Sequence, residues 1–191
     1  MEQQTGLSTL SLAILGVIHQ QAQTGYDIRK MFATTPLGHF SNSPGAIYPA
    51  LRRLEDAGWI RGRMGKGKTR RERVIYGITA RGLKTLKDHL SKPVTRDDVM
   101  WHMDDLMLRF AFMDQTVGCE STLRFLCELA EQLDAHVAQL RSYLDSVYDS
   151  MPMCGRLAME QGIESYEMNA RWARRAIEEL KRNMESGGKT K

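Results

Sequence analysis

The sequence predicts a mainly α-helical protein with a small β-hairpin, divided into two parts. The first part shows four short helical patterns and a Gly- and Lys-rich hairpin, and the second shows two long heptad repeats. Charge divides in the same way. Residues 1–92 carry 15 Lys and Arg against 6 Asp and Glu, a formal charge of +9, whereas residues 93–191 carry 12 against 17, a formal charge of −5. A basic part suits a polyanion, and an acidic helical part suits subunit contacts.

Composition limits the class of protein. The 191 residues are 42% hydrophobic and 26% charged, a balance typical of folded globular proteins and not of disordered chains. The longest apolar stretch, residues 7–18, is interrupted by Ser and Thr and is shorter than the roughly 20 residues of a membrane helix. No Lys or Arg precedes it, and the three cysteines lack C-x-x-C spacing. We therefore expect a cytoplasmic protein that does not contact membranes.

Two short helices are predicted at the start of the chain. Ser8 or Thr9 can cap a first helix that ends near Gln20, because apolar residues recur there at helical spacing. Thr24 can cap a second helix that ends near Phe32 or Ala33.

A third helix is predicted to follow Ser43-Pro44, a pair typical of helix starts. Ile47, Leu51 and Leu54 share one face of this helix. Pro49 is unusual inside a helix, so the helix is expected either to begin near Ile47 or to be kinked. Gly58 should end it.

A β-hairpin is predicted next, because residues 59–64 and 73–78 alternate with period two around a Gly- and Lys-rich connection. Thr79 can cap a fourth helix with Leu83, Leu86 and Leu90, closed by Lys92-Pro93. Three helices, a basic hairpin and a further helix are the components of a winged helix-turn-helix domain.

The second part begins with a capping box at Thr95–Asp98, which opens a connecting helix that Gly118 should break. Heptads then cover residues 126–151 and 159–184, with a turn at 152–155, and predict an antiparallel coiled-coil hairpin. The expected domains are a winged helix-turn-helix domain at 1–92, a connecting helix at 93–118, a dimerisation hairpin at 119–185 and a tail at 186–191.

Several motifs in the first part resemble the PadR family of transcriptional regulators. They are TGYDI at 24–28, SPGAIYPALRRLE at 43–55, GWI at 58–60 and YGITARG at 76–82. Residues 105–110, and Gly162-Ile163 with Trp172 and Leu180, are more loosely similar to the family's C-terminal helical domain, a type shared with the virulence activator AphA. The resemblance implies a DNA-binding regulator.

Candidate DNA-binding residues lie on the third helix and on the wing, by which we mean the hairpin with its connection. The helix face opposite Ile47 starts with small residues that permit close approach to bases, and tyrosine hydroxyls can bond phosphate. The wing places basic residues where they can contact phosphates or a minor groove. Two alternatives stay open: Tyr48 only packs beside the second helix, or the wing charges are simply solvated. The candidates are Tyr26, Ser41, Asn42, Ser43, Gly45, Tyr48, Arg52, Lys66, Lys68, Arg70 and Arg71.

Dimerisation is assigned to the apolar heptad positions of the two long helices. A dimer formed there would place its two DNA-binding domains about one DNA turn apart. The alternative is a hairpin within one chain whose seams bury only each other. Flanking apolar residues, including Phe125, Leu129, Tyr143 and Tyr148, would then be exposed. The assigned residues are Leu126, Leu133, Val137, Leu140, Leu144, Ile163, Tyr166, Ile177 and Leu180.

A small aromatic effector or a second regulator protein is a further candidate partner. Met and aromatic side chains adapt to varied ligands, although the same stripe also fits ordinary core. The candidate pocket residues are Met100, Trp101, Met103, Met107 and Phe110.

We expect a transcriptional repressor that binds a pseudo-palindromic double-stranded DNA site as a homodimer. The alternatives are an activator working with a second regulator and a winged-helix adaptor that holds a protein partner, although an adaptor has no evident need for a basic wing. The five histidines show no metal-ligand spacing, and no nucleophile or phosphate-loop motif is present. We expect no catalytic site, metal or cofactor.

Overall fold

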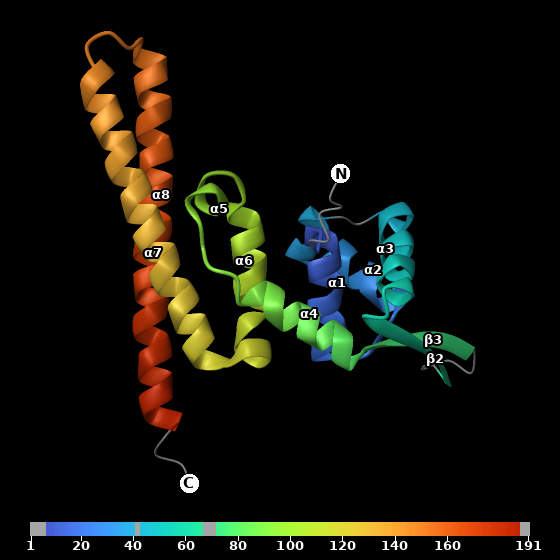
Figure 1. The fold of residues 1–191 in the computed structure, drawn as a ribbon. Helices are drawn as coiled ribbons and strands as arrows, with labels where there is room; N and C mark the ends of the chain where they lie inside the picture. Colours follow the sequence, from blue (N-terminus) through green and yellow to red (C-terminus); the bar gives the residue numbers. More distant parts are fainter. Residues whose placement is uncertain (1–6, 41–42, 67–71, 188–191) are drawn as a thin grey trace. The chain divides into compact units, whose positions relative to one another are not determined.

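The computed structural model describes residues 7–40, 43–66 and 72–187 (Figure 1). The backbone forms two compact units, Met1–Leu90 and Ser91–Lys191. The fold is mainly helical with one small antiparallel sheet, as the sequence predicts. Within the described ranges, no helix combines the length and the apolar character needed to cross a membrane.

The helices of the first unit begin at the predicted caps. The hydroxyls of Ser8, Thr24 and Ser43 accept hydrogen bonds from backbone N–H groups in the first turns of α1, α2 and α3. Each bond satisfies a donor that the helix itself leaves unpaired. The unit comprises α1 (Thr9–Gln20), β1 (Gln23–Thr24), α2 (Gly25–Thr34), the 3₁₀ helix η1 (Pro36–His39), α3 (Pro44–Asp56), β2 (Ile60–Lys66), β3 (Glu72–Ile78) and α4 (Ala80–Leu90).

The predicted hairpin is part of a three-stranded sheet with the order β1-β3-β2. β2 and β3 pair from Ile60 opposite Ile78 to Lys66 opposite Glu72, which makes both strands longer than expected. The sequence did not predict β1, whose two residues pair with Tyr76 and Ile75. Two residues are too few to show an alternating pattern, so only the tertiary fold identifies this strand.

α3 begins at Pro44 and continues through Pro49, so the expectation of a start near Ile47 is wrong. Pro49 lacks the N–H that would bond the carbonyl of Gly45, and Gly45 lies at the exposed start of the helix, where water can replace that bond. The predicted end at Gly58 is confirmed. Gly58 has φ +70°, its N–H bonds the carbonyl of Glu55 at 2.8 Å, and the N–H of Trp59 bonds the carbonyl of Leu54 at 2.9 Å. These two bonds are a Schellman motif.

The core of the first unit forms around α1. All residues from Ser11 to Ile18 are buried, so α1 is covered on every side. α3 contributes Ile47, Leu51 and Leu54, each at most 1% exposed, and α4 contributes Leu86 and Leu90. This packing fixes which side of α3 remains open to solvent.

The second unit comprises α5 (Arg96–Trp101), α6 (Met103–Ala111), α7 (Met113–Val147) and α8 (Met153–Gly187). The predicted capping box at Thr95 is present. The expected single connecting helix is instead divided at His102 and Phe112 into α5 and α6, which both pack on α7. Gly118 interrupts α7 with φ 79° and ψ 172°, as predicted.

α7 and α8 lie side by side and are joined by a short loop (Figure 1). Two ion pairs, Arg141 with Glu167 and Arg174 with Asp134, link them. The expectation that Phe125 and Leu129 are exposed on a single chain is wrong, since they are 3% and 0% exposed. Phe125 stacks on Phe110 with ring centroids 6.3 Å apart, a contact that sequence spacing does not reveal.

Candidate nucleic-acid interface

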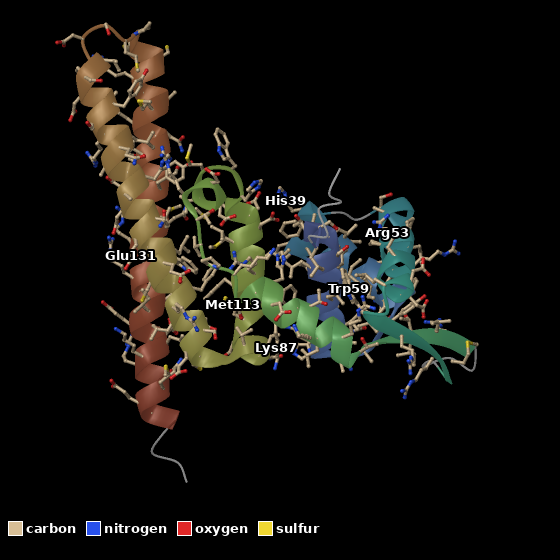
Figure 2. All side chains as sticks on the ribbon, viewed as in Figure 1. His39, Arg53, Trp59, Lys87, Met113 and Glu131 are labelled. Carbon is tan, nitrogen blue, oxygen red and sulfur yellow. The ribbon has the colours of Figure 1, made fainter. Side chains whose placement is uncertain are left out.

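The solvent side of α3 carries the predicted recognition residues. Ser43, Gly45 and Arg52 are exposed, whereas Ile47, Ala50 and Leu51 of the same helix are buried. Gly45 leaves open surface, because an added Cβ would approach only the Ser43 hydroxyl, at 3.4 Å. Figure 2 shows the described side chains and labels Arg53 on this helix. The first turn of α3 can therefore approach the floor of a groove closely.

Tyr48 combines packing with exposure. A Cβ added at Gly25 would lie 2.9 Å from Cε1 of Tyr48, so the ring packs directly on the backbone where α2 begins. The side chain nevertheless remains 47% exposed. Packing beside the second helix therefore does not prevent Tyr48 from meeting a phosphate.

Tyr26 joins α2 to the base of the wing. Its ring is 49% exposed and lies near two guanidinium groups, 5.6 Å from that of Arg29 and 5.7 Å from that of Arg73. Arg29 belongs to α2 and Arg73 to β3, so the ring links the two elements. The sequence marked Arg73 only as one of the basic residues of the wing and did not mark Arg29, since cation–π contacts depend on tertiary proximity.

A second link joins the end of α3 to the wing. Oε1 of Glu55 accepts a hydrogen bond of 2.8 Å from the N–H of Gly62 in β2. Tyr48, Arg52, Glu55 and Tyr76 line a hollow of about 580 Å³ beside this bond. The pKa of Tyr76 is raised, first by burial and then by the Glu55 carboxylate. The sequence did not mark Glu55 or Tyr76 as candidate functional residues.

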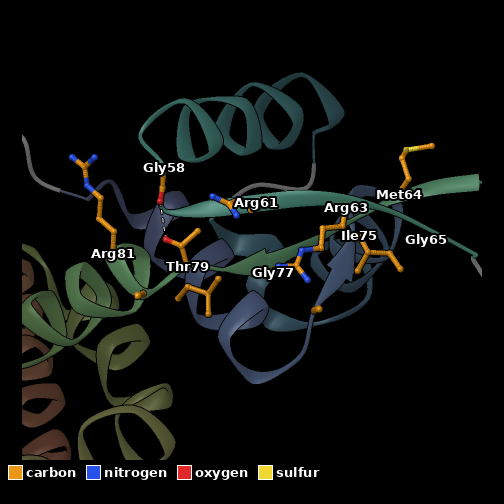
Figure 3. A pocket seen from close by; sticks show the side chains of 12 residues that line it. Gly58, Arg61, Arg63, Met64, Gly65, Ile75, Gly77, Thr79 and Arg81 are labelled. Carbon is orange, nitrogen blue, oxygen red and sulfur yellow. Dashed lines mark hydrogen bonds between the residues drawn. The ribbon is translucent and has the colours of Figure 1, made fainter.

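The other face of the hairpin also carries positive charge. Arg61 lies opposite Gly77, and Arg63 lies opposite Ile75, so both arginines share one face of the sheet. Both side chains are exposed, and with Arg81 they line a hollow of about 790 Å³ (Figure 3). Within the described ranges no carboxylate forms an ion pair with Arg61 or Arg63. The period-two pattern contained the signal that places these two arginines together.

Several predicted DNA-binding residues lie outside the described residues. Ser41, Asn42, Lys68, Arg70 and Arg71 are among them, and Lys66 is described only as the last backbone position of β2.

The predicted dimerisation residues divide into two groups. Leu126, Leu133, Leu144 and Ile163 are at most 8% exposed within one chain, as the intrachain alternative requires. The other five are half-buried: Val137, Leu140, Tyr166, Ile177 and Leu180. Large apolar side chains also remain exposed along α7, α8 and the loop between them: Tyr143, Tyr148, Met153, Leu157, Met168 and Met184.

The five predicted effector residues have different surroundings. Phe110 packs in an aromatic cluster, edge-on to Trp172 at 5.2 Å and stacked on Phe125. Trp101 is 71% exposed, so its own chain does not enclose it. Met100, Met103 and Met107 are half-buried. Phe110 therefore fits the core interpretation, while Trp101 does not.

A buried histidine and a buried arginine mark the interior of the second unit. His136 is 6% exposed and lies edge-on to Tyr166 at 4.6 Å, and its Nδ1 has no hydrogen-bond partner among the described residues. Burial, followed by the charge of Arg96, lowers the pKa of His136. Arg109 donates to the carbonyl of Lys92 and covers the Phe125 ring at 5.1 Å. Burial also lowers the pKa of Arg109.

Comparison with known proteins finds relatives for both units. A family model described as the transcriptional regulator PadR-like family matches residues 14–88, and one described as virulence activator alpha C-term matches residues 104–181. The negative transcriptional regulator PadR of Bacillus subtilis is 30% identical over 146 residues, 76% of this chain and 76% of that protein.

Two crystal structures of Bacillus subtilis PadR are also similar. The complex with operator DNA is 23% identical, with 91% of this chain and 99% of that chain covered and a TM-score of 0.41. The complex with p-coumaric acid is 22% identical, with the same coverage and a TM-score of 0.40.

Proposed function

The chain belongs to the PadR-like family of transcriptional regulators, and we propose that it is a repressor that binds a pseudo-palindromic operator as a homodimer. One observation supports this most strongly. α3 is held by its apolar side and leaves Ser43, Gly45 and Arg52 exposed. It lies next to a hairpin on which Arg61 and Arg63 are exposed and form no ion pair with a described carboxylate. This combination suits a groove lined by phosphates.

Within this proposal α3 reads bases and the wing binds the backbone. Ser43 and Arg52 would contact base edges in the major groove, and Gly45 would permit the approach. Tyr26 and Tyr48, whose side chains are about half exposed, would bond phosphates through their hydroxyl groups. Lys66, Lys68, Arg70 and Arg71 would add phosphate or minor-groove contacts, together with Ser41 and Asn42 before α3.

Dimerisation is proposed for the second unit, with residues 119–185 as the contact region and 93–118 as the connection. The half-buried seam residues and the exposed apolar side chains of α7 and α8 support it, because a monomer would leave this surface in water. A two-fold dimer would present two copies of α3 to two half-sites.

A small aromatic effector is proposed as the regulatory ligand, with Trp101 as the residue whose fluorescence changes when the ligand binds. An exposed Trp offers a flat apolar face to an aromatic ligand, and the half-buried methionines near it in the sequence can adjust to the ligand's shape. Quenching of Trp fluorescence that persists in Trp101→Phe would contradict this assignment.

The proposed function is tested with the purified full chain and the DNA upstream of its own gene, followed by selection from a random duplex library. We expect one enriched motif with two-fold symmetry, and saturable fluorescence anisotropy with a stoichiometry of one dimer per site. Binding that is weak, equal for all duplexes and unable to enrich a motif would contradict a specific regulator.

A further inference from the structure

Glu55 is a carboxylate on the part of α3 that is proposed to face DNA. On a helical wheel of 100° per residue it lies about 60° from Arg52 and about 20° from Tyr48. It is exposed, and it lines the same hollow as both of those residues. A negative charge at this place repels phosphates and by itself lowers affinity for DNA. If Glu55 contributes to DNA binding, it must do so in a way that outweighs this repulsion.

The contact of Glu55 with β2 supplies such a role. Because the strand order is β1-β3-β2, β2 is an edge strand, and alternate N–H groups of an edge strand point away from the sheet. Oε1 of Glu55 accepts the N–H of Gly62, one of these outward donors, at 2.8 Å. The bond therefore ties the last turn of α3 directly to the base of the wing.

Gly62 fits this contact because it has no side chain. A Cβ at this position would lie 2.6 Å from Cγ1 of Val74 and 3.0 Å from Oε1 of Glu55. A side chain at this position would clash with Val74 and crowd the Glu55 carboxylate. Tyr76, directly across from Gly62 on β3, occupies the adjacent side of the hollow.

We propose that Glu55 is a positioning residue, which orients the wing relative to α3 so that both can engage one DNA site together. The inference rests on the proposed function. Glu55 need not touch DNA. By holding Gly62 it raises the fraction of molecules in which the wing already has its binding orientation, and observed affinity scales with that fraction.

Asp56 provides a matched control. It is the next residue, it is exposed and lines the same hollow, and no hydrogen bond or ion pair of its side chain is found among the described residues. Asp56→Asn removes one negative charge near the interface and nothing else. Glu55→Gln removes the same charge but keeps an acceptor oxygen, whereas Glu55→Ala removes both.

The experiment measures affinity of the full chain for a duplex selected from a random library, by fluorescence anisotropy. Asp56→Asn and Glu55→Gln should bind as tightly as the original protein or more tightly, because each loses a repulsive charge. Glu55→Ala should bind about tenfold more weakly than Asp56→Asn, the factor associated with one charge-assisted hydrogen bond. Equal binding by Glu55→Ala and Asp56→Asn would overturn the proposal.

Two further measurements separate positioning from a general loss of structure. On a duplex trimmed of the flanking base pairs that the wing protects in footprints, Glu55→Ala and Asp56→Asn should bind equally. In protein without DNA, the Gly62 amide hydrogen should exchange faster in Glu55→Ala than in Glu55→Gln. A tenfold defect that persists on the trimmed duplex, or unchanged Gly62 exchange, would contradict the inference.

The outcome also distinguishes this inference from the function on which it depends. If the original protein enriches no motif, the proposed function fails, and the role of Glu55 in DNA binding fails with it. If a motif is enriched but Glu55→Ala matches the control on the full duplex, only the positioning role fails.

Discussion

The two units of this protein treat their charged side chains differently. In the second unit, two arginines pair with carboxylates across the helical hairpin, Arg141 with Glu167 and Arg174 with Asp134. In the first unit, Arg52, Arg61 and Arg63 are exposed, and no described carboxylate forms an ion pair with them. A paired charge is largely neutralised by its partner, whereas charges with no described partner remain available to an external polyanion. Together with the +9 charge of residues 1–92, this difference marks the first unit as the part suited to DNA.

Burial shows the same contrast. The first unit buries one side of α3 and keeps the other side polar, while the second unit still exposes large apolar side chains such as Tyr143, Met168 and Leu157. An exposed polar face beside the exposed Arg61 and Arg63 suits DNA, and exposed apolar surface suits another protein subunit. Four predictions test this division of labour.

The largest effect is expected in the second unit. Leu133→Asp places a carboxylate at a site that is 0% exposed and should destabilise the helical hairpin by about 4 kcal/mol or more, since a buried charge without a partner is very costly. Thermal unfolding followed by circular dichroism measures the loss. Gln139→Asp, at an exposed position of the same helix, is the control and should change little. Similar unfolding of both variants would mean that Leu133 is not specifically required.

A smaller loss is expected when the wing is neutralised. Replacing Lys66, Lys68, Arg70 and Arg71 with Ala should weaken binding to every duplex and reduce the slope of log affinity against log salt by about 0.9 for each lost phosphate contact. Lys84→Ala removes a charge already paired with Asp88 on α4 and is the control. An unchanged slope in the fourfold variant would exclude the wing as a phosphate clamp.

Changes on α3 should affect specificity more than overall affinity. Ser43→Ala or Arg52→Ala should alter base preference at particular operator positions by about 1–3 kcal/mol, because a base-edge contact is read one position at a time. Selection of binding sites by each variant measures the change. Recovery of the original motif with uniformly weaker binding would move the base-reading face away from these residues.

The smallest effect concerns pH and the second unit alone. Burial lowers the pKa of His136 from its ordinary value of 6.5, so the folded protein binds this proton less readily than the unfolded chain does. The resulting stability is fully present above pH 6.5 and is lost as the pH falls through the lowered pKa. The groups that face this site include Tyr166 of α8 and Arg96 of α5.

His136→Phe should remove that acid-dependent loss, while Glu131→Gln on the same helix should retain it. Chemical denaturation at a series of pH values measures the effect. If His136→Phe and the original protein lose stability in parallel below pH 6.5, another group is responsible.

The features that depend only on neighbouring residues could be predicted from the sequence. The caps at Ser8, Thr24, Ser43 and Thr95 are all used, and Gly58 ends α3 as predicted. A cap needs only a hydroxyl within about three residues of an unpaired N–H, so its signal is contained in the local sequence. The heptads likewise predicted α7 and α8, because their period follows from helix geometry alone.

The features that join distant segments depend on the packing of the whole fold. β1 pairs with β3 across about fifty residues, Phe125 is buried by Phe110 from another helix, and Glu55 bonds the backbone of Gly62. The backbone N–H that Glu55 accepts is present in almost every residue type, so no sequence pattern marks it as the partner. Such contacts form because packing of the whole unit brings the groups together, and local periodicity carries no information about which groups will meet.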